Sequence, residues 1–159
     1  MNTGGLRPPN IRRTVTIYCR YFDPATNFVR PLRRILTNVF YPEKQSTISA
    51  QTGVVSPQSA FYQVFSEPNM EYIPIWQWEE ISNKEEAEAL DGKWTVSLGA
   101  AASFIVPRKV DFEFNFMTPD QITNIENAFV NSTPGAGRIA SIDDNRRGSP
   151  LAEHLYLRV

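Results

Sequence analysis

The sequence has little of the chemistry that marks an enzyme or a metalloprotein. It contains one cysteine, Cys19, and one histidine, His154, in 159 residues. A single cysteine excludes an intrachain disulfide and a multi-cysteine zinc site, and one histidine without a nearby cysteine cannot anchor a usual zinc site. We interpret Cys19 as a small buried hydrophobe in a strand and His154 as a structural hydrogen-bonding residue.

The sequence also lacks long apolar runs and a large net charge. No stretch approaches the ~20 apolar residues of a membrane span, and the N-terminus has no signal-peptide segment. We therefore expect a protein that is made and used in a cytosol, with no membrane partner. Sixteen basic and seventeen acidic residues leave a net charge of -1, so no overall field recruits nucleic acid or an anionic membrane.

Recognised catalytic and ligand-binding motifs are missing as well. Neither GxGxxG nor GxxxxGK[ST] occurs, and no nucleophile, base and orienting group can be assembled from the chain. Asp143–Asn145 followed by Gly148 lacks the ligand spacing of a calcium loop, so we predict a turn there. Five glutamates between Glu79 and Glu88 raise the possibility of a metal or acid–base site, but three of them lie in a simple solvated helix face, which we take as the better interpretation. We expect no catalytic residue, metal or cofactor and conclude that the protein is not an enzyme.

What the sequence does contain is a long β-hairpin, predicted over Thr14–Tyr41. Its first arm alternates β-branched and aromatic residues with a period of two, and Asp23, Pro24 and Asn27 interrupt the pattern as a turn. The second arm carries apolar groups on both faces, which need cover from a barrel, a sandwich or a subunit interface. Pro31 lacks an amide donor and should lie at an edge or a bulge.

The remaining elements are predicted to be short. A loop or weak edge strand is expected over Pro42–Gly53. Further strands are predicted over Ser59–Phe65, Lys93–Leu98, Phe104–Pro107, Val110–Phe116, Arg138–Ile142 and Leu151–Val159, the last two as a hairpin. Of these, Val110–Phe116 has the cleanest half-buried pattern. Capping signals predict helical structure in Tyr72–Gly92, where Pro74 can start a turn and Ser82 with Glu85 has capping-box spacing, and an amphipathic helix over Pro119–Asn131, capped by Thr118 and Gln121.

These elements indicate a mainly β fold, a small antiparallel β-barrel or sandwich with one or two short helices. The length favours a single domain. Residues 1–13 are predicted to be an arm that is flexible in isolation, either a frayed terminus or an arm that docks on a partner subunit. Residues 14–159 are predicted to form the β-barrel domain.

Two groups of side chains are candidates for a protein–protein interface. The arginines are either solvated at strand edges or make salt-bridging or DNA-facing contacts in an assembly. Five large apolar residues within Tyr72–Trp78 either cap the core or form an interaction patch. The candidate interface residues are Arg12, Arg13, Arg30, Arg33, Arg34, Tyr72, Trp76 and Trp78.

Several segments resemble, in their order, a known family. They are TVTIYCRYFD, RRILTNVFY, the stretch from Gly53-Val54-Val55 to Phe65, YIPIWQW before GKWTV, the strand ending FIVP, IASIDDNRRGSP and HLYLRV. Over Thr14–Val159 the chain resembles minor virion proteins of tailed bacteriophages, the head-closure or head-completion type of phages of Gram-positive bacteria. It departs from that pattern in its long N-terminal arm and in a glutamate-rich insertion before Gly92.

The resemblance implies a β-barrel subunit of a homo-oligomeric ring in the virion neck, assembled in the host cytoplasm. Such a connector lies between the portal or adaptor protein and the tail-terminator or tail proteins, helps retain packaged DNA that passes through its lumen, and takes part in head–tail joining. Two alternatives stay open: an adaptor or tail-terminator ring protein of the same neck, and a nucleic-acid-binding β-barrel module. Steep salt dependence of DNA binding would favour the last.

Overall fold

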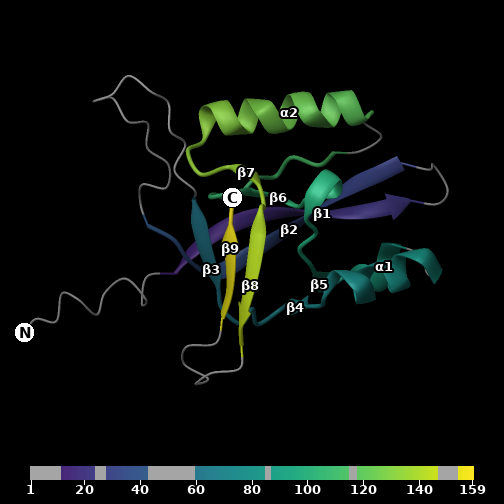
Figure 1. Cartoon of the computed structure of the whole chain (residues 1–159), viewed down its shortest axis with the longest axis horizontal. Helices are drawn as coiled ribbons and strands as arrows, with labels where there is room; N and C mark the ends of the chain where they lie inside the picture. The colour runs from purple at the N-terminus through teal and green to yellow at the C-terminus, as the bar shows by residue number, and fades with distance from the viewer. Residues whose placement is uncertain (1–11, 24–27, 43–59, 85–86, 115–117, 147–153) are drawn as a thin grey trace, which may run out of the picture.

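The computed structural model describes residues 12–23, 28–42, 60–84, 87–114, 118–146 and 154–159. Within them the fold is mainly β, as predicted, with a seven-stranded antiparallel sheet in the order β7-β6-β1-β2-β3-β9-β8. The strands of this sheet are β1 (Arg13–Asp23), β2 (Phe28–Phe40), β3 (Phe61–Val64), β6 (Phe104–Val106), β7 (Gly137–Arg138), β8 (Ser141–Asn145) and β9 (His154–Arg158). A parallel pair, β4 (Glu71–Tyr72) and β5 (Lys93–Trp94), lies beside it (Figure 1).

The predicted hairpin is confirmed. β1 and β2 pair antiparallel along their whole length, with Cys19 opposite Leu32 and a register shift after Arg13. β1 begins at Arg13, which pairs with Val39, and the arm predicted over residues 1–13 stays a prediction. Residues 1–11 and the turn at 24–27 lie outside the described residues.

The sheet curls so that its two edges come together. The two edge strands, β7 and β8, follow each other closely in the chain. β7 pairs with β6 and β8 pairs with β9, although only residues 139 and 140 separate the two edge strands. Between them, the Ile139 amide donates to the Ser103 carbonyl at 2.8 Å and the Ala140 amide donates to the Arg158 carbonyl at 2.7 Å. The strand predicted over Arg138–Ile142 is therefore divided between the two ends of the sheet.

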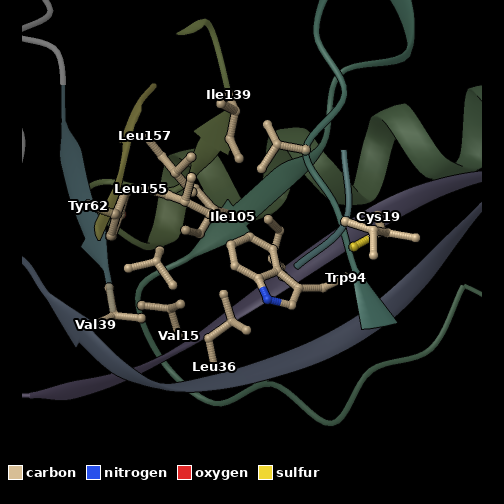
Figure 2. Close-up of a cluster of buried hydrophobic side chains, with 14 of the residues drawn as sticks. Val15, Cys19, Leu36, Val39, Tyr62, Trp94, Ile105, Ile139, Leu155 and Leu157 are labelled. Atoms are coloured by element: carbon tan, nitrogen blue, oxygen red, sulfur yellow. The ribbon is translucent and has the colours of Figure 1, made fainter. Parts of the chain in front are cut away.

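The interior of the curled sheet holds the main hydrophobic core (Figure 2). One face of β1 supplies Val15, Ile17 and Cys19, each with no exposed surface. Residues from β2, β3, β5, β6 and β9 pack with them; those labelled in Figure 2 include Leu36, Val39, Tyr62, Trp94, Ile105, Leu155 and Leu157. Cys19 is thus a buried core residue, as expected.

A second cluster covers the opposite face of β1. Tyr18 packs edge-on against Phe114, with ring centroids 4.9 Å apart, and Ile122 contributes from helix α2 (Pro119–Ser132). The predicted capping box of Thr118 and Gln121 begins this helix. Because both faces of β1 are covered, the strand is a central structural element and not a half-exposed one.

The prediction of a strand over Val110–Phe116 was wrong for its described part, residues 110–114. Both edges of the adjacent strand β6 are already occupied, by β1 and β7, so this segment cannot pair with β6. Side chains hold it instead. Thr16 Oγ1 accepts from the Val110 amide at 2.8 Å, and the Tyr18 hydroxyl donates to the Phe112 carbonyl at 2.8 Å.

Helical structure follows β4 as predicted, and its first turn starts at Pro74 as predicted. α1 (Ile75–Lys84) begins after Pro74, whose carbonyl accepts from the Trp78 amide at 3.0 Å. Ser82 lies inside α1 and donates to the Glu79 carbonyl at 3.0 Å, so the capping box predicted there was wrong. A short 3-10 turn, η3 (Ala87–Leu90), leads into β5, the only strand within the predicted Lys93–Leu98.

A buried ionic cluster ties β1 to α2. The guanidinium of Arg20 donates to the carboxylate of Glu126, and Arg20 Nε donates to the Ala102 carbonyl at 2.8 Å. Arg138 Nη2 binds the other carboxylate oxygen of Glu126 at 3.1 Å. The Glu126 side chain is 4% exposed, and each of its carboxylate oxygens binds one of the two guanidinium groups.

Removing that carboxylate should destabilise the fold strongly. We expect Glu126→Ala to lower the free energy of unfolding by about 3–5 kcal/mol, because it leaves the buried Arg20 guanidinium without its counter-charge. Urea unfolding followed by tryptophan fluorescence measures the change. The matched control is Asn127→Ala, an exposed neighbour on the same helix, expected to change stability by less than about 0.5 kcal/mol. Equal effects of the two substitutions would contradict the role given to the cluster.

Candidate interaction surface

A groove of about 760 Å³ lies beside the outer end of the β1–β2 hairpin. Its walls come from the hairpin, from α1 and from the segment after β5, and most of the side chains that line it are apolar. They include Phe22, Val29, Ile75, Trp78, Leu98 and Ala101. We call this feature the hairpin groove.

The outer part of the hairpin lacks strand partners on both sides within the described residues. β6 pairs with β1 only at Thr16–Tyr18, and β3 pairs with β2 only at Val39 and Phe40. The hairpin therefore extends as a two-stranded ribbon, which Figure 1 shows passing between α1 and α2. A ribbon of this kind leaves side chains and backbone at its end available to another chain.

Large apolar side chains are exposed along this groove. Phe22 is 42% exposed and Val29 38% exposed, and they are cross-strand partners on the same face of the ribbon. Leu98, 45% exposed, lies on the facing wall. Trp76, 65% exposed, is on α1 but does not line the groove. Exposed apolar side chains gathered at a groove mark a surface for another protein.

Few polar groups in the groove are open to a partner. The Trp78 indole N–H donates to the Arg20 carbonyl at 2.9 Å, and Ser97 Oγ donates to the Ala101 carbonyl at 2.6 Å. The Arg20 guanidinium forms an ion pair with Glu126. The exposed carboxylate on the wall is that of Glu79. The groove thus offers apolar surface together with one negative charge.

The aromatic residues predicted as interface candidates separate into different environments. Trp78 is 1% exposed and closes the bottom of the groove as part of the core, which is the core-capping alternative; its interface role stays a prediction. Tyr72 is half-buried against Trp94, and burial raises the pKa of its hydroxyl above the usual value although the Arg146 guanidinium, 5.0 Å from the ring, opposes this. Trp76 alone of the three is largely exposed, and its interface role stays a prediction.

The predicted arginines of β2 make contacts within the chain. Arg33 Nε binds Glu113 at 2.6 Å, and its Nη1 donates to the Val110 carbonyl at 3.0 Å. Arg34 donates to the carbonyls of Lys93 at 2.7 Å and Leu90 at 3.1 Å. Both side chains bind groups of their own chain, Arg33 in residues 110–113 and Arg34 at the end of η3 and the start of β5. Neither is one of the assembly contacts predicted for the arginines, so their interface roles stay predictions.

The other three predicted arginines lie over aromatic rings. Arg12 is 4.0 Å from the ring centroid of Phe65 and Arg13 is 5.3 Å from that of Tyr41, both at the start of β1. Arg30 is 5.5 Å from the ring centroid of Tyr21 near the other end of the hairpin. The structure therefore does not bring the predicted arginines into one patch, and their interface roles stay predictions.

Metal-binding and membrane features were sought in the same residues. The described residues hold no group of three or more His, Cys, Asp and Glu side chains that could bind a metal ion. His154 Nε2 lies 3.3 Å from Asn145 Nδ2, in keeping with a structural role. Asp143–Asn145 belongs to β8 and Arg146 is in a turn, so the predicted turn begins later than expected; its continuation to Gly148 lies outside the described residues. No described helix is long and apolar enough to cross a membrane.

Comparison with known proteins identifies a family. A family model matches residues 11–158, so the chain belongs to that family, described as a family of unknown function (DUF6751). No curated protein and no solved structure matches the chain.

Burial also determines how stability depends on pH. It raises the pKa of the Cys19 thiol from 9.0 to about 11, so the folded state keeps a proton that the unfolded state loses. Above about pH 9 the unfolded state binds fewer protons, and the free energy of unfolding falls with pH.

We expect this loss to be on the order of 1–2 kcal/mol between about pH 8 and pH 10.5. Urea midpoints at the two pH values measure it. Cys19→Ala lacks the thiol and should show a smaller fall, whatever its stability at about pH 8. An unchanged fall would mean that the thiol is not the responsible group.

Proposed function

We propose that this protein is a structural virion protein of a tailed phage, a subunit of the head-closure ring in the neck that joins the portal region to the tail and helps retain packaged DNA. The observation that carries the proposal is the hairpin groove beside a projecting ribbon with exposed Phe22 and Val29. This surface fits another protein chain, and the sequence resemblance supplies the kind of assembly.

A ring uses heterologous contacts, in which one patch of each subunit meets a different patch of the next. The ribbon end and the start of β1 are opposite ends of one long strand. If the ribbon end of each copy contacted the start of β1 in the next copy, the same contact would repeat around the ring. The net charge of -1 also suits a subunit whose main partners are proteins. An adaptor or tail-terminator ring of the same neck would use the same kind of surface.

The contacts of Arg33 and Arg34 weigh against the alternative of a nucleic-acid-binding module. Both guanidinium groups donate to groups of their own chain. We expect the purified protein to bind duplex DNA weakly, with a slope of log K against log salt near zero. A slope of about -4 or steeper, measured by fluorescence anisotropy, would indicate several phosphate contacts and favour the alternative.

Deleting the gene tests the proposal in the phage. Phage lacking this gene should produce heads that lose their DNA and fail to join tails, and a copy supplied in trans should restore infectious particles. Electron microscopy and plaque counts measure both effects. Normal joining of heads and tails without the gene would overturn the proposed function.

The surface is tested by substitution in the complementing copy. We expect Phe22→Ser to weaken subunit association at least about 10-fold, because truncating a hot-spot anchor of an interface costs about 2 kcal/mol or more and about 1.4 kcal/mol is a factor of ten. Val130→Ser is the matched control, since Val130 is 47% exposed but lies on α2. Sedimentation velocity of the purified variants measures association. Equal behaviour of the two variants would remove the hairpin groove from the interface.

A further inference from the structure

We propose that the hairpin groove of one copy receives Leu6-Arg7-Pro8-Pro9 of a neighbouring copy. This inference rests on the proposed ring and names the contact that links its subunits. Residues 1–11 lie outside the described residues, so the argument uses their sequence, their reach and the chemistry of the groove.

The groove favours a particular kind of segment. Its exposed walls are apolar and partly aromatic, and its carboxylate is that of Glu79. Proline-rich segments bind grooves lined by aromatic and apolar side chains because they lose little conformational entropy on binding. A guanidinium in such a segment would pair with the carboxylate through charge-assisted hydrogen bonds.

The chain itself contains a segment with these properties. Leu6 is a large apolar residue, Pro8 and Pro9 restrict the backbone, and Arg7 carries the positive charge. The Arg7 guanidinium, which is adjacent in sequence to the two prolines, is the group that would pair with the Glu79 carboxylate. Charge complementarity thus favours this segment as the occupant.

Reach limits which part of its own chain's groove the segment can contact. From Arg13 to Phe22 β1 spans nine residues, a contour of about 30 Å at ~3.3 Å per residue. Arg7 precedes Arg12 by five residues, which extend at most about 18 Å. Figure 1 shows the start of β1 and the ribbon end on opposite sides of the molecule. The segment therefore falls short of the Phe22 end of the groove in its own chain, although Tyr72 lines both the groove and the pocket that contains Arg12. Contact with the neighbour's groove is the arrangement that would link the subunits of the proposed ring.

Cysteine cross-linking of the full-length protein tests this contact. A chain carrying both Leu6→Cys and Leu98→Cys should give a ladder of covalent multimers on a non-reducing gel after mild oxidation, since each arm meets the next groove. Native Cys19 is buried and does not compete. The control chain pairs Leu6→Cys with Val130→Cys on α2 and should give no ladder. An intrachain product, or no ladder at any protein concentration, overturns the inference.

A charge exchange provides a second test in the same full-length chain. Arg7→Glu and Glu79→Arg should each weaken association about 10-fold, and the double variant should recover most of the loss. Glu88→Arg, an exposed position on η3 outside the groove, is the control and should not rescue Arg7→Glu. Additive weakening in the double variant, or no effect of either single change, overturns the pairing.

The outcomes separate this inference from the proposed function. If rings form but neither the cross-link nor the charge rescue is observed, the arm does not bind the groove, and the proposed neck role is unaffected. Normal head–tail joining after gene deletion would remove the neck role, whatever the cross-link shows.

Discussion

Burial of β1 on both faces is the constraint on which the rest of the structure depends. Every residue from Val15 to Tyr21 is at most 9% exposed, so each face needs its own cover. The curled sheet covers one face, and α2 with residues 110–114 covers the other. Polar residues on the second face must then find partners inside the protein. The Thr16 hydroxyl binds the Val110 amide and the Arg108 carbonyl, and Arg20 binds Glu126. The same contacts that satisfy these groups also attach the covering layer.

Elements determined by local signals could be predicted from the sequence. The hairpin follows from alternation and turn residues, and α2 follows from helical spacing and a capping box, because these signals lie within a few residues of each other. Val110–Phe116 has an equally regular pattern, but a strand also needs a free edge. β6 pairs with β1 on one side and β7 on the other, and no local pattern reports that occupancy.

The candidate site was only partly predictable for similar reasons. Trp76 and Trp78 are two residues apart, and a helix turns through about 200° over that distance, so one ring points into the core and the other outward. The sequence of this aromatic segment does not show which of the two tryptophans is buried. The groove was missed because Phe22, Leu98 and Glu79 come from three segments far apart in the chain. The arginine partners, such as Glu113 for Arg33, are equally distant in sequence.

The two open edges of the ribbon are not equivalent, and this difference explains why side chains would dominate contacts there. The Arg20 carbonyl faces away from β2, as its hydrogen bond from the Trp78 indole N–H shows. Its partner Pro31 therefore also directs its backbone outward, but without an N–H to donate. Further along β2, the Glu67 carboxylate accepts from the Thr37 and Asn38 amides at 2.9 and 2.6 Å. Extension of the sheet at this edge is thus disfavoured, whereas the β1 edge opens into the groove. A partner at the ribbon end would gain more from apolar side-chain contact than from added backbone pairing.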